Sequence, residues 1–271
     1  MGQTVAILNQ KGGVGKTTVT MGLASAAMAK GHKILVVDLD PQGASSWMLG
    51  VDASTSEHSV ADVLTSPRGG SAKGCIRPSQ WSHLVDVLPS APDLQNLEVL
   101  KAGLESVLLG NKAQNRLRKG LHKITDGYAA VLIDCPPSLG SLTTNGLAAA
   151  HQALMVVEPT ALSLRGLGPA ADLIDEVWSS HNRDLELAGV IVNRMPPRSH
   201  DADVRYDELE RSVGKKSVWK PEIPHRVVLA EAAAAQKPIH AMGARGREVA
   251  EIFDRLYGKL WRIIKPGRAE N

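Results

Sequence analysis

Short, continuous apolar runs recur along this chain of 271 residues, each bounded by charged or turn-forming residues. Such runs are typical of strands that are buried on both faces of a parallel sheet. We expect these strands at Thr4–Leu8, Lys33–Asp38, Leu84–Leu88, Ala129–Asp134, Ala153–Val157 and Glu186–Val192, with a short one around Val218.

Stretches of helical periodicity separate the strands. Strands that alternate with helices predict right-handed βαβ units, and hence an α/β fold with a doubly wound, mostly parallel sheet covered by helices on both faces. The expected helices are Thr17–Lys30, Asp93–Leu109, Asn111–Thr125, Ser141–His151, Leu164–His181, Asp201–Val213, Leu229–Ala235 and Arg245–Ile264.

The region from Ser54 to Pro92 interrupts this alternation and has too little apolar periodicity to form its own core. We therefore expect a surface excursion within a single domain that spans residues 1–271, with residues 265–271 as a frayed tail. The length of the chain is sufficient for one substantial core.

Composition narrows the class of protein. The two cysteines, Cys75 and Cys135, form no C-x-x-C pair, so we expect neither a disulfide framework nor a metal cluster, and a reducing cytoplasm fits. No apolar run approaches transmembrane length, and the first strand follows Met1 so closely that we expect no signal peptide.

Charge is distributed unevenly along the chain. The net charge is +3, yet the part from Asn193 onward carries 16 Lys and Arg against 11 Asp and Glu. A basic C-terminal third favours a polyanion or an anionic membrane surface as partner.

The segment Lys11-Gly-Gly-Val-Gly-Lys-Thr-Thr18 lies between the first strand and the first helix. A glycine-rich turn at a helix N-terminus directs backbone N–H groups at an anion, which predicts a phosphate-binding loop. Lys16 would reach the β- and γ-phosphates of a nucleotide, and the Thr17 hydroxyl would bind Mg²⁺. The common pattern has glycine where this chain has Gln10. The nucleotide-binding prediction covers Lys11, Gly12, Gly13, Val14, Gly15, Lys16, Thr17 and Thr18.

Acidic residues follow two other predicted strands, and the carboxyl ends of parallel strands lie at one edge of the sheet, where ligands bind. Asp134 is the expected metal-side carboxylate, holding a water bound to Mg²⁺. Asp40 is the expected catalytic group that positions the attacking water, with a share in the metal site. Asp38 lies one strand repeat further back.

The loop, together with Val37-Asp-Leu-Asp-Pro-Gln-Gly43 and Ile133-Asp-Cys-Pro-Pro-Ser138, resembles the ParA branch of the ParA/MinD deviant-Walker phosphate-loop ATPases. Gly189–Asn193 and the stretch from Ile223 to Ile239 also occur in family order, so the resemblance covers nearly the whole chain. It is to the short form without an N-terminal helix-turn-helix.

This resemblance implies an ATPase that uses ATP and Mg²⁺, hydrolyses slowly by itself and forms a homodimer with ATP. Lys11 would be the signature lysine that crosses to the partner's phosphates, so it joins Lys16 and Asp40 as a catalytic residue. Asn193 and Pro224 would border the adenine. The ATP-bound dimer would bind nucleoid DNA without sequence preference in the cytoplasm, and a ParB-like protein that binds the centromere would stimulate hydrolysis and DNA release.

One departure from the family concerns DNA. The family often has an arginine at the position of Val228 in the stretch Ile223–Leu229, and this arginine contacts DNA. DNA binding must then depend on other cations, and the candidates are Arg194, Arg198, Lys215, Lys216, Lys220, Arg226, Lys237, Arg245 and Arg247.

Three other functions share parts of this pattern. Phe253, Leu256, Leu260 and Ile264 lie at helical spacing, typical both of an interfacial helix in a MinD-like membrane ATPase and of a helix packed on the sheet; we favour packing. A redox ATPase resembling the nitrogenase iron protein would need cysteines at other spacings. An ATPase that positions another cargo shares the same ATPase half, so the sequence does not separate it from DNA partition.

Overall fold

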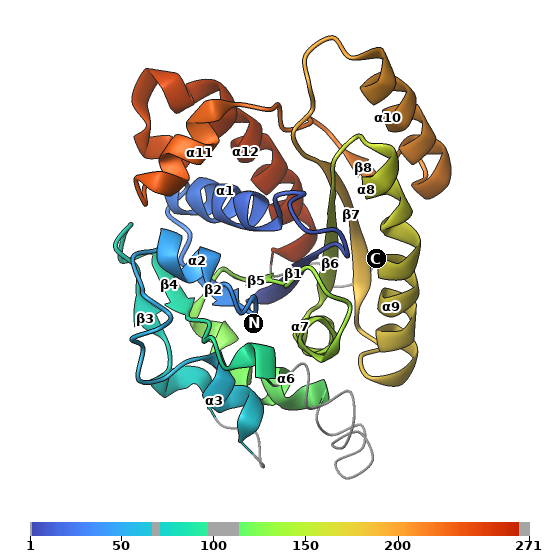
Figure 1. The fold of residues 1–271 in the computed structure, drawn as a ribbon. Helices are drawn as coiled ribbons and strands as arrows, with labels where there is room; N and C mark the ends of the chain where they lie inside the picture. Colours follow the sequence, from blue (N-terminus) through green and yellow to red (C-terminus); the bar gives the residue numbers. More distant parts are fainter. Residues whose placement is uncertain (1, 67–70, 97–113, 266–271) are drawn as a thin grey trace.

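The computed structural model describes residues 2–66, 71–96 and 114–265 (Figure 1). The described strands form one eight-stranded sheet in the order β3-β4-β2-β5-β1-β6-β7-β8. All neighbouring strands are parallel except the edge pair β3 and β4. Their bounds are β1 Gln3–Leu8, β2 Ile34–Asp38, β3 Arg77–Pro78, β4 Val85–Leu88, β5 Ala130–Asp134, β6 Gln152–Val157, β7 Glu186–Val192 and β8 Val218–Trp219.

Helices cover both faces of the sheet, as the sequence predicts (Figure 1). One hydrophobic cluster contains buried residues of α1, α11 and α12, and the other contains those of α3, α6, α7 and α9. The α-helices are α1 Lys16–Ala29, α2 Ala44–Met48, α3 Val60–Thr65, α6 Arg116–Leu121, α7 Ser141–Ala149, α8 Ala161–Arg165, α9 Leu167–Ser180, α10 His200–Val213, α11 Val227–Ala234 and α12 Gly243–Ile264.

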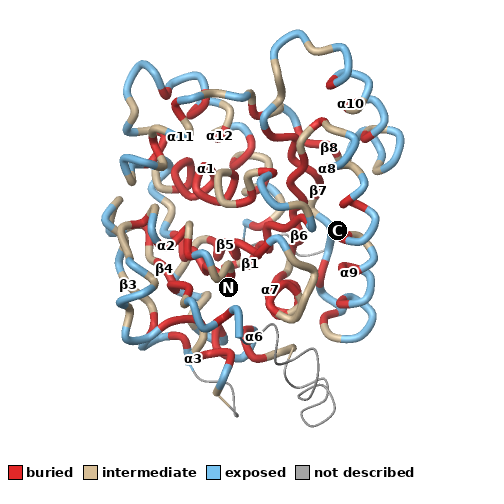
Figure 2. Tube along the Cα trace, in the orientation of Figure 1, coloured by how far each residue is buried: buried red, intermediate tan, exposed pale blue. Residues whose placement is uncertain are grey.

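The central strands are buried throughout (Figure 2). Their parallel register aligns the carboxyl ends of β1, β5 and β2, where Ile7 pairs with Asp134 and Asp134 pairs with Asp38. The sheet thus brings together residues that are about a hundred positions apart in the sequence.

Three predicted elements differ from the structure. Of the helix expected at Asn111–Thr125, the described residues form an α-helix over Arg116–Leu121. It ends there because the backbone becomes extended at His122 and Lys123 has a positive φ of 63°. The helix expected from Leu164 to His181 is divided into α8 and α9 at Gly166. Most of the helix predicted at Asp93–Leu109 lies outside the described residues.

The region Ser54–Pro92 is more than a surface excursion. It contributes β3 and β4 to the sheet, and Val60, Val63 and Leu64 of α3 enter the core. Its Ser59 caps α3 by accepting a hydrogen bond from the N–H of Ala61. The short helix was missed because six residues are too few to establish a helical period.

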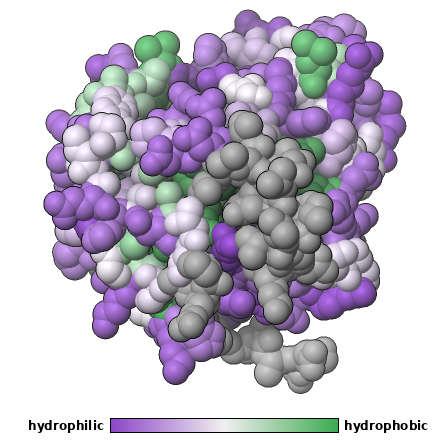
Figure 3. Space-filling view, turned by 60° about the horizontal axis from the view of Figure 1, so that its bottom comes forward, coloured by the Kyte–Doolittle hydropathy of each residue, from purple (hydrophilic) through white to green (hydrophobic). Residues whose placement is uncertain are grey.

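Helix α12 packs its apolar stripe against α1 and the sheet. Phe253, Leu256, Tyr257 and Leu260 are fully buried, as expected for a packed helix. None of the described helices combines the length and the apolarity needed to cross a bilayer. Seen from the lower side of the molecule, the described surface is mostly hydrophilic, with apolar residues in small separate patches (Figure 3).

Candidate functional site

The phosphate-binding loop follows β1 and leads into α1, as the sequence predicts. Gly13 and Gly15 have φ values of 83° and 88°, a left-handed conformation that glycine adopts without strain. A Cβ at Gly15 would also collide with the side-chain amide of Asn193. That amide donates a hydrogen bond of 2.8 Å to the carbonyl of Val14, so the end of β7 supports the loop from below.

The start of the loop is attached to β6 by Asn9, which the sequence did not single out. Its Nδ2 donates to the carbonyl of Val156 over 2.6 Å, and its Oδ1 accepts from the N–H of Lys11 over 2.9 Å. Asn9 is almost fully buried. The loop is therefore held in place by the sheet on both sides, which prepares its N–H groups for an anion without further ordering.

Lys16 lies inside the loop and is 7% exposed. Its Nζ donates to the carbonyl of Lys11 at 3.4 Å. Burial lowers the pKa of Lys16, and the neighbouring carboxylate of Asp134 opposes this shift. A bound polyphosphate would supply further negative charge and stabilise the charged ammonium.

Asp134 is 1% exposed and receives two hydroxyl hydrogen bonds on one oxygen. Thr17 Oγ1 donates to Oδ2 at 2.7 Å, and Ser45 Oγ donates to the same atom at 2.6 Å. Burial raises the pKa of Asp134, whereas the bonds from Ser45 and Thr17 and the charge of Lys16 lower it. A carboxylate beside hydroxyl groups is the oxygen donor set that Mg²⁺ prefers, so these residues fit the expected metal.

Asp38 and Asp40 differ in environment. Asp38 is fully buried and accepts bonds from the N–H and the hydroxyl of Ser46, at 2.8 and 2.7 Å. Its burial, with the charge of Asp134 nearby, raises its pKa to about 7. Asp40 is half-buried, and its N–H donates to Asp38 Oδ1 at 3.1 Å. Asp38 therefore holds the backbone of Asp40, whose own carboxylate accepts a hydrogen bond from the N–H of Gln42 at 3.0 Å and is near enough to Lys16 to raise its pKa.

The serines of α2 complete this edge and were not predicted. Ser45 contacts Asp134 and Ser46 contacts Asp38, and both are fully buried. The sequence does offer a signal for them, since both serines follow the turn Asp-Pro-Gln-Gly. A helix that begins beside the end of a strand can direct its first side chains toward the residues at that end.

Glu158, which follows β6, forms ion pairs with Lys11 of the loop and with Arg194, which follows β7. Lys11 Nζ lies 3.6 Å from one of its oxygens, and Arg194 Nη1 donates to the other at 2.8 Å. Arg194 also donates to the carbonyl of Gly13 at 2.6 Å. Arg194, a predicted DNA contact, thus lies against the phosphate loop.

The two residues expected near the adenine lie in neighbouring segments, Asn193 directly after β7 and Pro224 in the stretch between β8 and α11. Asn193 is buried, and its Oδ1 has no hydrogen-bond partner within the described part of the chain. Pro224 is paired with Met195 in an isolated parallel bridge next to Asn193. An unpartnered amide oxygen beside the loop fits a donor such as the amino group of adenine.

The other predicted DNA contacts lie on the surface of the C-terminal third, and several are paired. Arg226 binds Glu248 through two hydrogen bonds, Arg245 pairs with Glu231, and Lys220 and Lys215 lie near Glu210. Val228, at the position of the family's arginine, is buried in the core. Exposed and without an ion pair among the described residues are Arg198, Lys216, Lys237 and Arg247.

Cys75 and Cys135 are free and buried, and both belong to the hydrophobic cluster that contains α3, α6, α7 and α9. Burial raises the pKa of both thiols. Within residues 2–66, 71–96 and 114–265, no group of three or more His, Cys, Asp or Glu side chains could hold a metal ion by itself.

The chain is similar over most of its length to known proteins. A family model described as an AAA domain matches residues 2–187. The chromosome partitioning protein ParA of Myxococcus xanthus is 34% identical, covering 88% of this chain and 81% of that protein. The chromosome-partitioning ATPase Soj of Thermus thermophilus is 37% identical, covering 87% of this chain and 86% of that protein.

Solved structures show the same fold. Cobyrinic acid a,c-diamide synthase from Mycobacterium smegmatis superimposes with a TM-score of 0.80 at 28% identity, covering 99% of this chain and 97% of that chain. The same protein with a bound ATP analog and magnesium gives 0.73 at 28% identity, covering 93% of each chain. The cell division ATPase MinD of Pyrococcus furiosus gives 0.72 at 26% identity, covering 97% of this chain and all of that one.

Proposed function

The chain belongs to the ParA/Soj family of partition ATPases, and on this premise we propose that it is an ATP-driven DNA partition protein acting as a single ATPase domain. Its ATP-bound form pairs as a sandwich dimer and binds nucleoid DNA in the cytoplasm without sequence preference. Hydrolysis, stimulated by a ParB-like partner, releases the DNA.

The observation that carries this proposal is the difference in exposure between the two lysines of the loop. Lys16 is buried within the loop, where it would reach the phosphates of its own subunit. The side chain of Lys11 is 31% exposed on the outer side of the loop and is held by Glu158. Lys11 is thus available to a nucleotide on a second subunit, as a signature lysine requires.

The reaction proposed is hydrolysis of ATP to ADP and phosphate. Backbone N–H groups of the loop and the Lys16 ammonium would bind the β- and γ-phosphates. Thr17 would supply a direct oxygen ligand to Mg²⁺, and Asp134 would hold one of its water molecules. When bound, Mg²⁺ neutralises charge on the phosphates and orients them for attack.

Asp40 would position the attacking water, since its charge acts on Lys16 and Asp38 holds its backbone N–H. Lys11 of a partner subunit would supply a further cation at the γ-phosphate. Slow turnover by the single subunit follows, because phosphoryl transfer depends chiefly on positioning and electrostatic stabilisation. Asn193 Oδ1 and Pro224 would border the adenine.

DNA binding is proposed from charge rather than from a motif. The first candidates are the exposed cations of the predicted set that form no ion pair with a described residue: Arg198, Lys216, Lys237 and Arg247. DNA phosphates can also bind Lys215, Lys220, Arg226 and Arg245 if they replace the carboxylates that are paired with these side chains. Contacts to phosphates carry no sequence information and release counterions, so binding should weaken steeply with salt.

The MinD-like membrane alternative would require the apolar stripe of α12 to be available to lipid. Phe253, Leu256 and Leu260 are instead fully buried in the core, which favours the DNA proposal. Positioning of another cargo uses the same ATPase cycle, and a binding screen with the candidate cargo in place of a ParB-like protein separates the two.

The decisive experiment is size-exclusion chromatography with light scattering on Asp40→Ala, with ATP and with ADP. A dimer with ATP and a monomer with ADP are expected, together with salt-sensitive binding of unrelated duplexes only in the ATP state. Lys11→Ala should retain nucleotide but remain monomeric, whereas Lys16→Ala should lose nucleotide. An ATP-bound Asp40→Ala protein that stays monomeric, or that binds one DNA sequence selectively, contradicts the proposal.

A further inference from the structure

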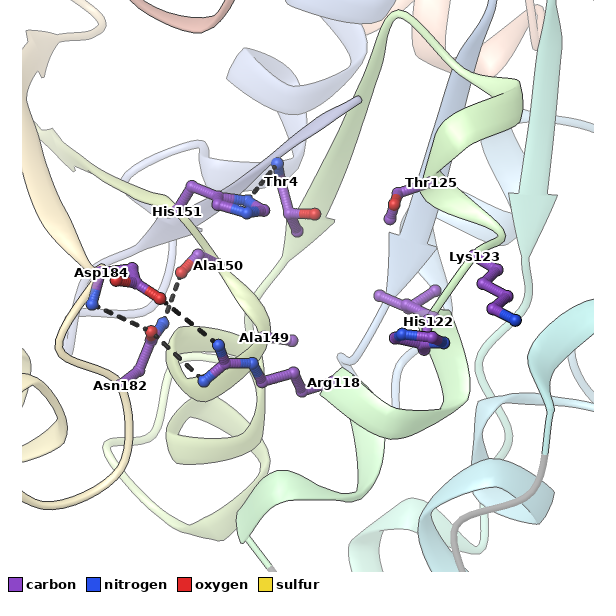
Figure 4. Close-up of a pocket in the computed structure, with 11 residues that line it drawn as sticks. Thr4, Arg118, His122, Lys123, Thr125, Ala149, Ala150, His151, Asn182 and Asp184 are labelled. Atoms are coloured by element: carbon purple, nitrogen blue, oxygen red, sulfur yellow. Dashed lines mark hydrogen bonds and ion pairs between the residues drawn. The ribbon is translucent and has the colours of Figure 1, made fainter. Parts of the chain in front are cut away.

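A second pocket lies at the edge of the sheet opposite the phosphate loop (Figure 4). It is formed where β1, β6 and β7 begin, beneath α6 and the turn that follows it, and its volume is about 180 Å³. Leu121, Ala149 and Ala150 form an apolar wall, and the other lining side chains are polar or charged. The proposed ATPase mechanism does not use this pocket.

His151 presents a fixed hydrogen-bond donor at this pocket. The backbone N–H of Thr4 donates to His151 Nδ1 at 3.0 Å, so this nitrogen must be the acceptor. Burial lowers the pKa of His151, and the charge of Arg118 lowers it further, so the ring is neutral at pH 7 and its proton lies on Nε2. The N–H of His151 in turn donates to the carbonyl of Thr4 at 2.8 Å, which holds the ring to β1.

Two residues with permanent positive charge, Arg118 and Lys123, line this pocket. The Arg118 guanidinium is only weakly engaged, because its contacts to Asn182 Oδ1 and Asp184 Oδ2 are both 3.5 Å long. The carboxylate of Asp184 is 74% exposed and therefore offsets little of this charge. Lys123, at the outer side of the pocket, is exposed and forms no ion pair with any described residue. The pocket is therefore electropositive and rich in donors.

From this geometry we propose that the pocket binds a small oxyanion, a phosphate or a carboxylate, independently of the proposed ATPase site. Arg118 contributes a planar donor pair suited to two oxygens, and His151 Nε2 contributes a neutral donor. Lys123 lies at the rim with its ammonium turned outward (Figure 4), where it adds positive potential. The volume corresponds to about six water molecules at roughly 30 Å³ each, which leaves room for a short carbon group on the anion against the apolar wall.

The test uses the full chain saturated with ADP and Mg²⁺, so that the phosphate loop is occupied. Inorganic phosphate and, separately, succinate are titrated by calorimetry, and amide NMR shifts locate the bound anion. One anion per chain is expected, with the largest shifts at Thr4, His151 and Arg118. The more tightly bound of the two probes identifies the class of ligand.

Arg118→Gln should weaken binding of the anion at least tenfold and Lys123→Gln should weaken it less, while the binding of ADP stays unchanged in both. Arg211→Gln, which removes an exposed arginine from α10, is the matched control and should leave the anion unaffected. Absence of binding at millimolar anion overturns the proposal, as does equal weakening by Arg211→Gln or shifts confined to the phosphate loop. None of these results depends on ATP-driven dimerisation or on DNA.

Discussion

Glycine 22 of α1 provides a sharp test of how α12 is packed. An added Cβ at Gly22 would lie well inside van der Waals contact with the ring of Phe253, which is fully buried. The ring is enclosed by the core and cannot turn away without displacing its neighbours. We therefore expect Gly22→Ala to destabilise the protein, although alanine is the better helix former.

The magnitude follows from two opposing contributions. Overpacking a well-filled core costs about 1–3 kcal/mol, and contact with an immobile aromatic ring favours the upper value. Replacing a mid-helix glycine by alanine gains about 1 kcal/mol. The net loss in free energy of unfolding is then about 2 kcal/mol, which lowers the melting temperature by roughly 4–8 °C for a chain of this size.

Gly258 of α12 is the matched control, because nothing lies within 4 Å of a Cβ added there. Gly258→Ala should raise the free energy of unfolding by about 0.5–1 kcal/mol, the helix-propensity gain without a clash. Both variants are measured by urea denaturation without nucleotide. In addition, Phe253→Leu should remove most of the cost of Gly22→Ala, giving a coupling energy of about 1 kcal/mol or more. Two results would contradict the packing of α12 on α1 described above. One is a Gly22→Ala protein as stable as Gly258→Ala, and the other is additive changes in the free energy of unfolding for Gly22→Ala and Phe253→Leu.

Three further predictions concern the site. First, Asp38 has a pKa of about 7 in the folded state and 3.8 in the unfolded state, so the folded state binds more protons at pH values between the two. The free energy of unfolding without nucleotide should therefore fall as the pH rises from about 4 to 7. Urea midpoints should show this slope in the parent and less of it in Asp38→Asn. Second, Gly15→Ala should abolish nucleotide binding, because Gly15 has a φ of 88° and an added Cβ would collide with Asn193. A titration with a fluorescent nucleotide measures the affinity, and the far-UV circular dichroism should match that of the parent; normal affinity would refute this. Third, Lys216→Ala should weaken the binding of ATP-loaded protein to all duplexes alike. It should also reduce the slope of log K against log salt by about 0.9, and an unchanged slope would show that Lys216 does not contact DNA.

The architecture could be predicted in outline because it depends on local patterns. Buried parallel strands are continuous apolar runs, and the predicted strands at Thr4–Leu8 and Ala129–Asp134 agree with β1 and β5 to within one residue. The phosphate loop is equally local, since its glycines, its lysine and the following helix are contiguous. Where local signals were weak, at α3 and beyond His122, prediction failed, because short helices depend on tertiary contacts rather than on their own period.

Only the tertiary structure decided how the loop is supported. Asn9, Ser45, Asn193 and Glu158 reach the loop or its carboxylates from four separate elements, and no spacing in the sequence connects them. Their proximity follows from sheet order and register, which aligned the carboxyl ends of strands distant along the chain. The sequence by itself determined that a phosphate loop is present and that Lys11 accompanies Lys16. The tertiary structure decided that Lys16 is buried within that loop, whereas Lys11 is partly exposed and paired with Glu158. The burial of a side chain depends on neighbours that only the folded sheet brings into contact.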